Sequence, residues 1–344
     1  MDSIIVTGGA GYIGSHVAKS LAAAGYRPVV FDNLATGNRW AVRWGPFEKG
    51  DLLDADRLDA VFAAHRPKGI VHLAALSDVA ASFEETDAYL AVNVTGTRHL
   101  IEAAMRHGAP PIVFSSTCSV YGIPDWLPIR EGAPKVPINP YGETKLAAEA
   151  LLEEAARGGL PSIALRYFNV AGADPDGEIG EARQVETHLI PRLFQSVTGD
   201  GDPIRIMGTD YPTPDGTAIR DYVHVSDLAD VHLEALAQLR QGHGGGAYNF
   251  GSGKGHSVRE VVDAVERVTG MTVPTILAPR RAGDPPALYT DAEAAHAAFG
   301  ADSTRRSDID TIVETAWRWH RQWAASASGA VRRDVATILP SENS

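Results

Sequence analysis

Tyr141 and Lys145 are the two residues whose types and spacing most directly suggest proton transfer. They open an expected helix in NPYGETKLAAEALLEEAA, where a separation of four residues puts both side chains on one face. A tyrosine phenol ionises at a pH of about 10, so it needs a nearby positive charge to act as a base at neutral pH. The Lys145 ammonium would supply that charge, and Tyr141 could then take a proton from a substrate hydroxyl. An exposed pair without a catalytic role is the alternative.

A cluster of hydroxyl side chains could orient the hydroxyl that Tyr141 deprotonates. Ser115, Ser116 and Thr117 end an expected strand in PIVFSSTCSVYG. Ligands bind at the carboxyl ends of the strands in open α/β sheets. We therefore expect one of these residues to contact the substrate hydroxyl and share its proton.

Three glycines near the N-terminus have the spacing of a dinucleotide-binding turn. In IIVTGGAGYIGSHVAKSLAAAG, Gly8, Gly11 and Gly14 lie between an apolar strand and a helix. The absence of a Cβ permits a tight turn, close approach of a pyrophosphate and close packing of helix on strand. The free N–H groups at the start of the helix would face the phosphates. An ordinary turn is the alternative, but strand, glycines and helix occur in the expected order.

An acidic residue at the end of the second expected strand indicates which dinucleotide binds. Asp32 ends PVVFD, where a carboxylate can accept hydrogen bonds from the adenosine ribose and would repel a 2′-phosphate. NAD is therefore expected as the cofactor in preference to NADP. Asp51, which follows a later strand, could reach the adenine, but it could equally be a helix N-cap.

The elements that position these residues alternate between short β-rich runs and helical patterns. Strands are expected at 3–7, 28–32, 47–50, 69–73, 111–116 and 162–167, and helices at 11–24, from about 54, at 88–105, 141–157, 227–239 and 257–269. This alternation is typical of a parallel sheet covered by helices. The fold class predicted is therefore α/β, a Rossmann-type doubly wound parallel sheet.

The second half of the chain has a different character. After Phe168, glycine, proline and aspartate become frequent and the elements between them are short. We expect an irregular α/β lobe that closes over a ligand. The predicted domains are 1–170 for NAD, with a segment at about 220–240 returning to it, 171–325 for the substrate, and a flexible C-terminal tail at 326–344.

The composition limits the classes of partner. A net charge of −12 argues against a nucleic-acid partner, because proteins that bind nucleic acids usually carry a basic face. No apolar run approaches the ~20 residues that cross a bilayer. With one cysteine, neither a disulfide framework nor a multi-cysteine zinc site is expected, and we expect no metal. The first residues lack a signal-peptide pattern, so a cytoplasmic protein is expected.

Longer motifs identify a family. They include TGGAGYIGSH, VFDNL, NVTGT, FSSTCSVYG, NPYGETK, LRYFNVAGA, ETHLIP, DYPTPDGTAIRDYVHV, NFGSGKGHSV and PRRAGDPPA. In these motifs the chain resembles the extended short-chain dehydrogenase/reductase family, and within it the UDP-glucose (UDP-galactose) 4-epimerases. The resemblance extends from residue 4 to about 323, and several motifs are too long to be generic to dinucleotide-binding folds.

The resemblance implies a catalytic triad of Thr117, Tyr141 and Lys145, with NAD bound throughout the cycle. Tyr141 would deprotonate the C4 hydroxyl of a UDP-hexose while hydride passes from C4 to NAD. The 4-keto sugar would turn about its link to the diphosphate and receive hydride on its other face, which inverts C4. The expected cofactor site is completed by Tyr12, Ile13, Asn33, Leu52, Leu73, Ala74, Ala75, Asn93, Ser115 and Tyr167.

The resemblance also implies residues that bind the UDP-sugar. Asn169, Arg220 and Arg281 would contact the phosphates or the sugar, and Asp284 would accept a hydrogen bond from the uridine ribose. The arginines suit this role because a guanidinium can donate two parallel hydrogen bonds to phosphate oxygens. The expected substrate site is completed by His188, Leu189 and Met207.

Four positions depart from the family pattern. Ser77 stands where relatives have a lysine that reaches the cofactor, and His188 stands in place of an asparagine. Met207 replaces an aromatic residue that stacks on uracil, and a thioether covers that face less specifically. Leu288 has intermediate bulk where side-chain size limits the room for an N-acetyl group, so plain hexoses and N-acetylhexosamines both stay open.

Several other functions stay as alternatives. A 4,6-dehydratase would need an Asp-Glu pair after the hydroxyl residue, but Cys118 and Ser119 follow Thr117. A 4-epimerase for UDP-xylose and UDP-arabinose, or for UDP-N-acetylhexosamines, would have similar motifs. A non-catalytic NAD-sensing protein of the same fold belongs to a different class, but it would not need the triad. Because relatives pair through two helices, a homodimer through 88–105 and the Tyr141 helix is expected.

Overall fold

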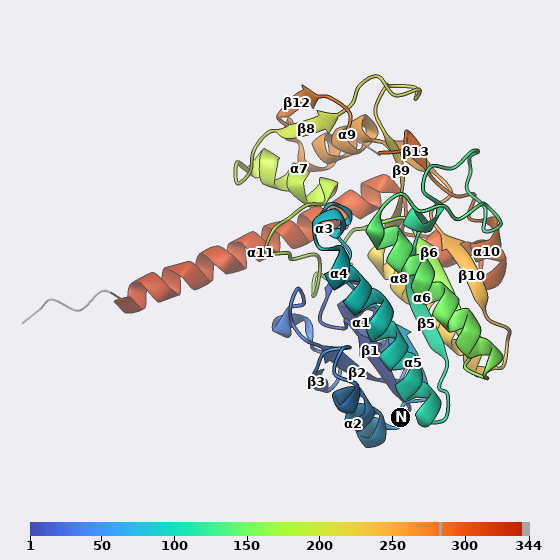
Figure 1. Ribbon diagram of the computed structural model, residues 1–344. Helices are drawn as coiled ribbons and strands as arrows, with labels where there is room; N and C mark the ends of the chain where they lie inside the picture. The colour runs from blue at the N-terminus through green and yellow to red at the C-terminus, as the bar shows by residue number, and fades with distance from the viewer. Residues whose placement is uncertain (282–283, 339–344) are drawn as a thin grey trace, which may run out of the picture.

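A seven-stranded parallel sheet forms the centre of the computed structural model, which describes residues 1–281 and 284–338 (Figure 1). Its order is β10-β6-β5-β4-β1-β2-β3. The strands are β1 (Ser3–Thr7), β2 (Arg27–Asp32), β3 (Phe47–Lys49), β4 (Ile70–His72), β5 (Ile112–Thr117), β6 (Ser162–Tyr167) and β10 (Gly246–Phe250). The strands read as apolar runs because helices cover both faces. The predicted doubly wound α/β fold is confirmed.

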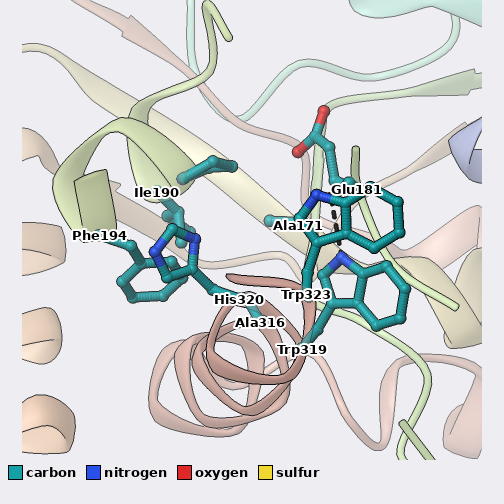
Figure 2. Close-up of a pocket in the computed structure, with 10 residues that line it drawn as sticks. Ala171, Glu181, Ile190, Phe194, Ala316, Trp319, His320 and Trp323 are labelled. Carbon is teal, nitrogen blue, oxygen red and sulfur yellow. Dashed lines mark hydrogen bonds between the residues drawn. The ribbon is translucent and has the colours of Figure 1, made fainter. Parts of the chain in front are cut away.

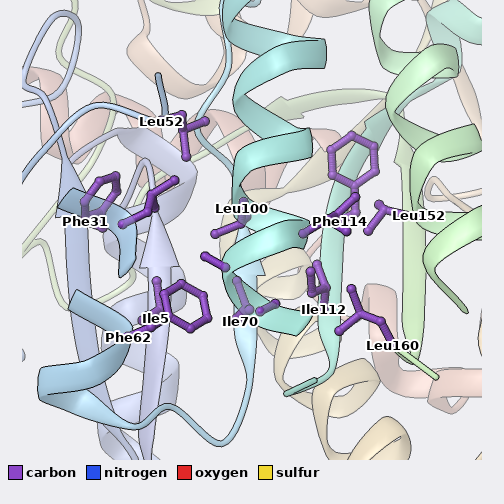
Figure 3. Packing of buried hydrophobic residues seen from close by; sticks show 14 of the residues in the cluster. Ile5, Phe31, Leu52, Phe62, Ile70, Leu100, Ile112, Phe114, Leu152 and Leu160 are labelled. Atoms are coloured by element: carbon purple, nitrogen blue, oxygen red, sulfur yellow. The ribbon is translucent and has the colours of Figure 1, made fainter. Parts of the chain in front are cut away.

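The two faces of the sheet carry separate cores. Ile5 packs with residues of α2 (Ala55–His65), α5 (Gly96–Arg106) and α6 (Pro140–Arg157), as the cluster in Figure 3 shows. Its neighbours Ile4 and Val6 pack on the other face with residues of α1 (Tyr12–Ala23) and α8 (Val225–Arg240). This division follows from the alternation of side chains along a strand.

The helix expected at 88–105 is interrupted. The structure has α3 (Val79–Glu84), α4 (Thr86–Tyr89), a π-helical segment at Leu90–Thr95, and then α5. A helical run therefore covers 88–105 as predicted, but apolar periodicity does not reveal the local widening of its turns. π-helical turns often occur at functional sites, and this one contains Asn93, which is 2% exposed.

The second lobe lies beyond the carboxyl ends of the main strands (Figure 1). It is built around β9 (Ile219–His224), which pairs with β7 (Asn169–Ala171), β11 (Gly255–Ser257) and β13 (Ala287–Leu288). A parallel pair, β8 (Ile204–Met207) and β12 (Thr275–Ala278), and the helices α7 (Leu189–Thr198) and α9 (Val258–Thr269) complete it. A capping box between Ser257 and Glu260 starts α9.

The segment that returns to the first domain is longer than predicted. α8 packs on the main sheet, as the segment at about 220–240 was expected to do. The edge strand β10, however, comes from Gly246–Phe250 and pairs with β6. α10 (Glu293–Phe299) also contributes Ala295 to the core beneath α8. The chain therefore crosses between the lobes more often than the composition indicated.

The C-terminal region is helical well beyond the predicted start of the tail. α11 (Ile309–Ile338) is continuous, so residues 326–338 of the expected tail are helical, and 339–344 lie outside the described residues. The weak apolar period hid this helix, but its many alanines favour it. Figure 1 shows the far end of α11 leaving the body of the protein. Within the described ranges, no helix combines the length and apolar character needed to cross a bilayer.

Candidate active site

The glycine turn after β1 is packed closely against the loop after β4. Gly8 has a φ of 68°, and a Cβ there would lie 2.7 Å from the backbone N of Ala74. A Cβ on Gly14 would lie 2.2 Å from the carbonyl oxygen of Gly8. No side chain caps α1 at Gly11, and its first turn contains no acidic residue. The free N–H groups at this helix start therefore face a space that fits an anionic phosphate.

Asp32 closes the other side of this turn. Its carboxylate accepts hydrogen bonds from the backbone N–H of Ala10 at 3.0 Å and of Leu34 at 2.8 Å. Burial raises the pKa of Asp32, and these two hydrogen bonds lower it in part. Each oxygen still has a free lone pair for a ribose hydroxyl. Asn33 donates to Asp51 at 2.9 Å, so the two acidic residues lie at one edge of the site.

The other residues expected at the cofactor fall into two groups. Tyr12, Ile13, Leu73, Ala74 and Ala75 are half-buried along the strand ends, and Asn33 is exposed. The side chain of Leu52 belongs to the apolar core, so it is available to a cofactor mainly through its backbone. These residues fit the adenosine and diphosphate of NAD, and the role of each one stays a prediction.

Asn93 has a full set of protein partners. Its side-chain amide donates to the carbonyl of Leu76 and to the hydroxyl of Thr144, both at 3.0 Å. Its side-chain oxygen accepts from the N–H of Leu76 at 2.9 Å. Asn93 therefore holds the loop after β4 against α6. Its predicted contact with the cofactor is untested.

Tyr141 lies in the first turn of α6, where it is 9% exposed. Asn139 caps this helix by accepting from the N–H of Gly142 at 2.8 Å, and Pro140 suits the first helical position. Burial raises the pKa of Tyr141, while a hydrogen bond with the Thr117 side chain lowers it in part. The phenol alone therefore stays protonated, and a base at this position needs positive charges nearby.

Lys145 supplies one such charge from a buried position. Its side chain is 2% exposed, and its ammonium donates to the carbonyl of Ser115 at 2.8 Å. It also lies over the ring of Phe114, 4.9 Å from the ring centroid. Burial lowers the pKa of Lys145 to about 7, and the negative charge of Glu149 raises it in part. A lysine in this range can change its charge near neutral pH.

The three hydroxyl residues at the end of β5 have different partners. Ser115 is hydrogen-bonded to the hydroxyl of Tyr167, and Ser116 to the carboxylate of Glu149. Thr117 accepts from the N–H of Ser119 at 3.1 Å, and its side chain also lowers in part the pKa of the Tyr141 phenol. The geometry thus brings together Thr117, Tyr141 and Lys145, as the resemblance implied.

Two residues predicted on the substrate side are paired with each other. Arg220 donates to the carboxylate of Asp284 at 2.8 Å and to the carbonyl of Ile219 at 2.7 Å. Arg281 is exposed close to Asp284, whose N–H donates to the Arg281 carbonyl at 3.3 Å. Asn169 is exposed on β7 and Met207 is half-buried at the end of β8. All lie in the second lobe, including Asn169 and Arg220, which the predicted boundaries assigned to the NAD domain.

His188 and Leu189 begin α7. His188 is its N-cap residue, although its side chain does not cap the helix. Its Nδ1 is 2.6 Å from Glu181 Oε1, and Arg183 donates to the same oxygen at 2.8 Å. This hydrogen bond leaves Nε2 of His188 free to face a ligand. Half of the His188 side chain is exposed.

An apolar hollow lies behind α7. It has a volume of about 400 Å³, open solvent included, between α7 and α11. Figure 2 shows Ile190, Phe194 and His320 on one side of it and Trp319 and Trp323 on the other. Trp40 stacks on Trp319 and packs at a tilt against Trp323, with ring centroids 5.6 and 4.8 Å apart, and thereby joins α11 to the first domain. The lining of this hollow includes none of the predicted site residues.

Sequence reasoning missed Glu149 and Arg166, which form a buried ion pair beside Lys145. Arg166 Nη2 is 2.6 Å from Glu149 Oε2, and the two side chains are 3% and 4% exposed. A signal was available in the sequence. Tyr141, Lys145 and Glu149 follow one another at intervals of four residues, so they share one face of α6.

The site predicts a specific effect of Asp32 on NAD binding. Asp32→Asn keeps an acceptor for one backbone N–H but removes the charge that binds the ribose hydroxyls. The affinity of the stripped enzyme for NAD should fall at least about tenfold, because hydrogen bonds to charged groups contribute about 1.5–3 kcal/mol. Calorimetric titration with NAD and NADP measures this. Asp56→Asn, on the exposed surface of α2, is the matched control; equal affinities for both variants would contradict the assignment.

Comparisons with known proteins agree with this geometry. The NAD dependent epimerase/dehydratase family matches residues 4–251. The UDP-glucose 4-epimerase of Rhizobium meliloti (strain 1021) is 45% identical over 320 residues, which are 93% of this chain and 97% of that protein. The structure of UDP-glucose 4-epimerase from Brucella ovis in complex with NAD is 49% identical, with a TM-score of 0.89 over 92% of this chain and 97% of that one.

A third comparison concerns a structure with a bound sugar nucleotide. The UDP-glucose-4-epimerase from Stenotrophomonas maltophila, with bound NAD and formylated UDP-arabinopyranose, is 36% identical with a TM-score of 0.91. The match covers 95% of this chain and 100% of that chain. The resemblance seen in the motifs and the expectation of NAD are confirmed. The chain therefore belongs to the NAD dependent epimerase/dehydratase family, and it is an isomerase that uses NAD.

Proposed function

We propose that Thr117, Tyr141 and Lys145 catalyse the inversion of C4 in a UDP-hexose such as UDP-glucose or UDP-galactose. The observation that carries this proposal is the buried cluster at the carboxyl end of β5, where Thr117, Tyr141 and Lys145 are 6%, 9% and 2% exposed and the Lys145 ammonium donates to the Ser115 carbonyl at 2.8 Å. Ligands bind at this edge in doubly wound sheets. Relatives that match nearly the whole chain are UDP-glucose 4-epimerases.

The three residues divide the proton transfer between them. Tyr141 takes the proton of the C4 hydroxyl, because its phenolate is within the reach of one hydrogen bond in a productive pose. Thr117 orients that hydroxyl and shares its proton. Lys145 favours the phenolate through its positive charge. NAD, when bound, supplies the hydride acceptor and donor and a second positive charge.

The substrate side requires an exchange of partners. Arg220 forms an ion pair with Asp284 at 2.8 Å. We infer that this pair opens or widens when the diphosphate approaches Arg220 and the uridine ribose approaches Asp284. Asn169, His188, Leu189, Met207 and Arg281 complete the proposed UDP-sugar site. Most surface arginines are solvated charges without a binding role. This explanation is weaker for Arg220, because its side chain is only 14% exposed.

The dehydratase alternative is disfavoured by the residues around Thr117. A dehydratase must move a proton from C5 and expel the C6 hydroxyl, so it needs an acid near the sugar. Cys118 cannot serve, because burial raises the pKa of its thiol to about 12. Glu149 accepts a hydrogen bond from Ser116 on this strand, but both of its oxygens are bound by Arg166. Asp221, whose charge acts on Cys118, has its two oxygens bound by Ser252 and Gly253. The arrangement therefore favours chemistry confined to C4.

The bulk of Leu288 bears on which UDP-sugar the site accepts. Leu288 packs with Cys118, Tyr121 and Phe168, so it lies in the cluster that flanks Thr117. A leucine of this bulk allows plain hexoses, and it leaves UDP-xylose, UDP-arabinose and N-acetylhexosamines as alternatives. Comparing the turnover of UDP-glucose, UDP-N-acetylglucosamine and UDP-xylose distinguishes them.

We infer that the protein is a cytoplasmic homodimer. The cytoplasmic location is part of this proposal, and recovery of the protein with the membranes on cell fractionation would contradict it. The dimer rests on the helices at 88–105 and around Tyr141. Figure 1 shows α4 and α5 beside α6 on one face. Near them Phe83, Leu90 and Met105 are 62%, 47% and 40% exposed, and such apolar patches mark interaction sites.

The dimer makes a prediction about mass. The wild-type protein should elute with twice the 36.6 kDa mass of one chain. Leu90→Glu should shift it toward the monomer, because a charge buried in an apolar interface is costly. Light scattering during size-exclusion chromatography measures both masses. Ile276→Glu, on the exposed strand β12, is the control; a monomeric wild-type protein would refute the dimer.

The proposed base makes a prediction about turnover. Wild-type enzyme should convert UDP-galactose to UDP-glucose, and Tyr141→Phe should retain NAD yet lose at least about 100-fold in kcat, the usual scale of general-base catalysis. Product analysis by chromatography and the absorbance of released NAD measure both properties. Tyr26→Phe, which lies under Arg240 far from this cluster in the sequence, is the matched control. Normal turnover by Tyr141→Phe would sink the assignment of the base.

A further inference from the structure

Glu149 and Arg166 place a second pair of charges in the interior beneath the active site. Arg166 donates from Nε to Glu149 Oε1 at 2.9 Å and from Nη2 to Oε2 at 2.6 Å. The Ser116 hydroxyl also donates to Glu149 Oε1. Both charged side chains are almost completely buried. Glu149 is therefore held by three hydrogen bonds in one orientation.

Stability alone is a weak reason for such a pair. Removing two charges from water costs several kcal/mol per ion, and well-packed apolar residues in their place are often as stable or more so. Two apolar residues on α6 and β6 would extend the surrounding core. The presence of this ion pair next to a catalytic group is therefore better explained by the effect of its charge than by stability.

Glu149 lies one helical turn from Lys145, on the same face of α6. The direct contacts of the Lys145 ammonium are uncharged: the Ser115 carbonyl at 2.8 Å and the Phe114 ring. Burial lowers the pKa of Lys145, and the negative charge of Glu149 opposes that effect. Glu149 thus acts on the stability of the ammonium without touching it.

The other titratable groups around Lys145 are neutral in the working range. Burial, together with the charge of Lys145, lowers the pKa of His72 on β4 to about 3, so its imidazole is uncharged. Burial raises the pKa of Cys118, of Tyr167 on β6 and of Tyr89 on α4 to about 12. Among the described residues, the charge found to act on the Lys145 ammonium is therefore that of Glu149, which is paired with Arg166.

Arg166 is fixed from its far side as well. Its Nη1 donates to the hydroxyl of Tyr121 at 2.9 Å, and that hydroxyl donates to the side-chain oxygen of Asn249 at 2.6 Å. Asn249 donates in turn to the carbonyl of Ile129 at 3.2 Å. The guanidinium therefore cannot swing toward Lys145, and it stays paired with Glu149.

We propose that Glu149 is a positioning residue for the reaction, which keeps Lys145 as an ammonium ion so that Tyr141 can act as a phenolate. The proposal rests on the proposed roles of Tyr141 and Lys145. Without the carboxylate charge, only the Ser115 carbonyl and the Phe114 ring offset the cost of burying the Lys145 ammonium. The lysine then loses its proton at a lower pH, and the phenolate loses its stabilising charge.

The direction of the pH effect follows from the negative sign of the Glu149 charge. Activity requires the ammonium form of Lys145, so it declines at high pH as that proton is lost. Removing the negative charge makes the proton leave more easily, which moves the alkaline limb of the kcat profile to lower pH. A nearby charge shifts a pKa by about 1–3 units, so Glu149→Gln should move this limb by about one pH unit or more.

The experiment compares the kcat for UDP-galactose of the NAD-loaded wild type and variants. The range from about pH 5 to 10 extends to both sides of the Lys145 pKa of about 7. Glu149→Gln should lose about tenfold or more at the pH optimum of the wild-type enzyme, and its limb should move to lower pH. Glu149→Asp, which keeps the charge, should restore most of the wild-type profile. Glu153→Gln is the matched control, because it removes an exposed charge one turn further along α6.

The outcome that overturns the proposal is a uniform loss of kcat at every pH with an unmoved alkaline limb, since a purely structural role gives that result. If Glu149→Gln does not fold, the double variant Glu149→Met with Arg166→Met removes both charges without stranding one. It should shift the limb in the same direction by less, and an unmoved limb overturns the proposal again.

Activity in Tyr141→Phe would instead defeat the proposed function. Inactive Tyr141→Phe with a wild-type profile for Glu149→Gln would defeat this inference alone.

Discussion

A positive charge buried at Lys145 is the constraint around which the active site is built. An ammonium ion in an interior is costly unless other groups compensate for the loss of water. Here a backbone carbonyl, an aromatic ring and the charge of Glu149 provide that compensation. The balance leaves Lys145 with a pKa of about 7, so a modest change in its surroundings decides whether the charge exists.

The fold brings these groups together because the strands are parallel. In a parallel sheet all carboxyl ends meet at one edge, so the glycine turn after β1, Asp32 and Thr117 converge there. α6 then follows β5 and lays its Tyr141, Lys145 and Glu149 face along the same edge. The second lobe covers this edge with Arg220 and Asp284. Cofactor, base and substrate groups thus come from segments far apart in the sequence.

Local patterns predicted most of the fold and the cofactor side of the site. The turn around Gly14, the strand ending in Asp32 and the i,i+4 pair each depend on a few adjacent residues, and the structure places them as expected. Features set by tertiary contacts could not be predicted this way. The π-helical turn around Asn93 and the ion pair of Glu149 with Arg166 depend on partners 17 or more residues away. The length of α11 was missed because its apolar period is weak.

The central claim is that a buried ammonium makes Tyr141 a phenolate in the working enzyme. Ultraviolet difference titration of the NAD-loaded protein tests it most directly, by comparing wild type with Tyr141→Phe and Lys145→Met. The account predicts one tyrosine in the wild type that ionises well below a pH of about 10, a signal absent from Tyr141→Phe and moved to higher pH in Lys145→Met. Identical titrations for the wild type and Tyr141→Phe over that range would contradict it.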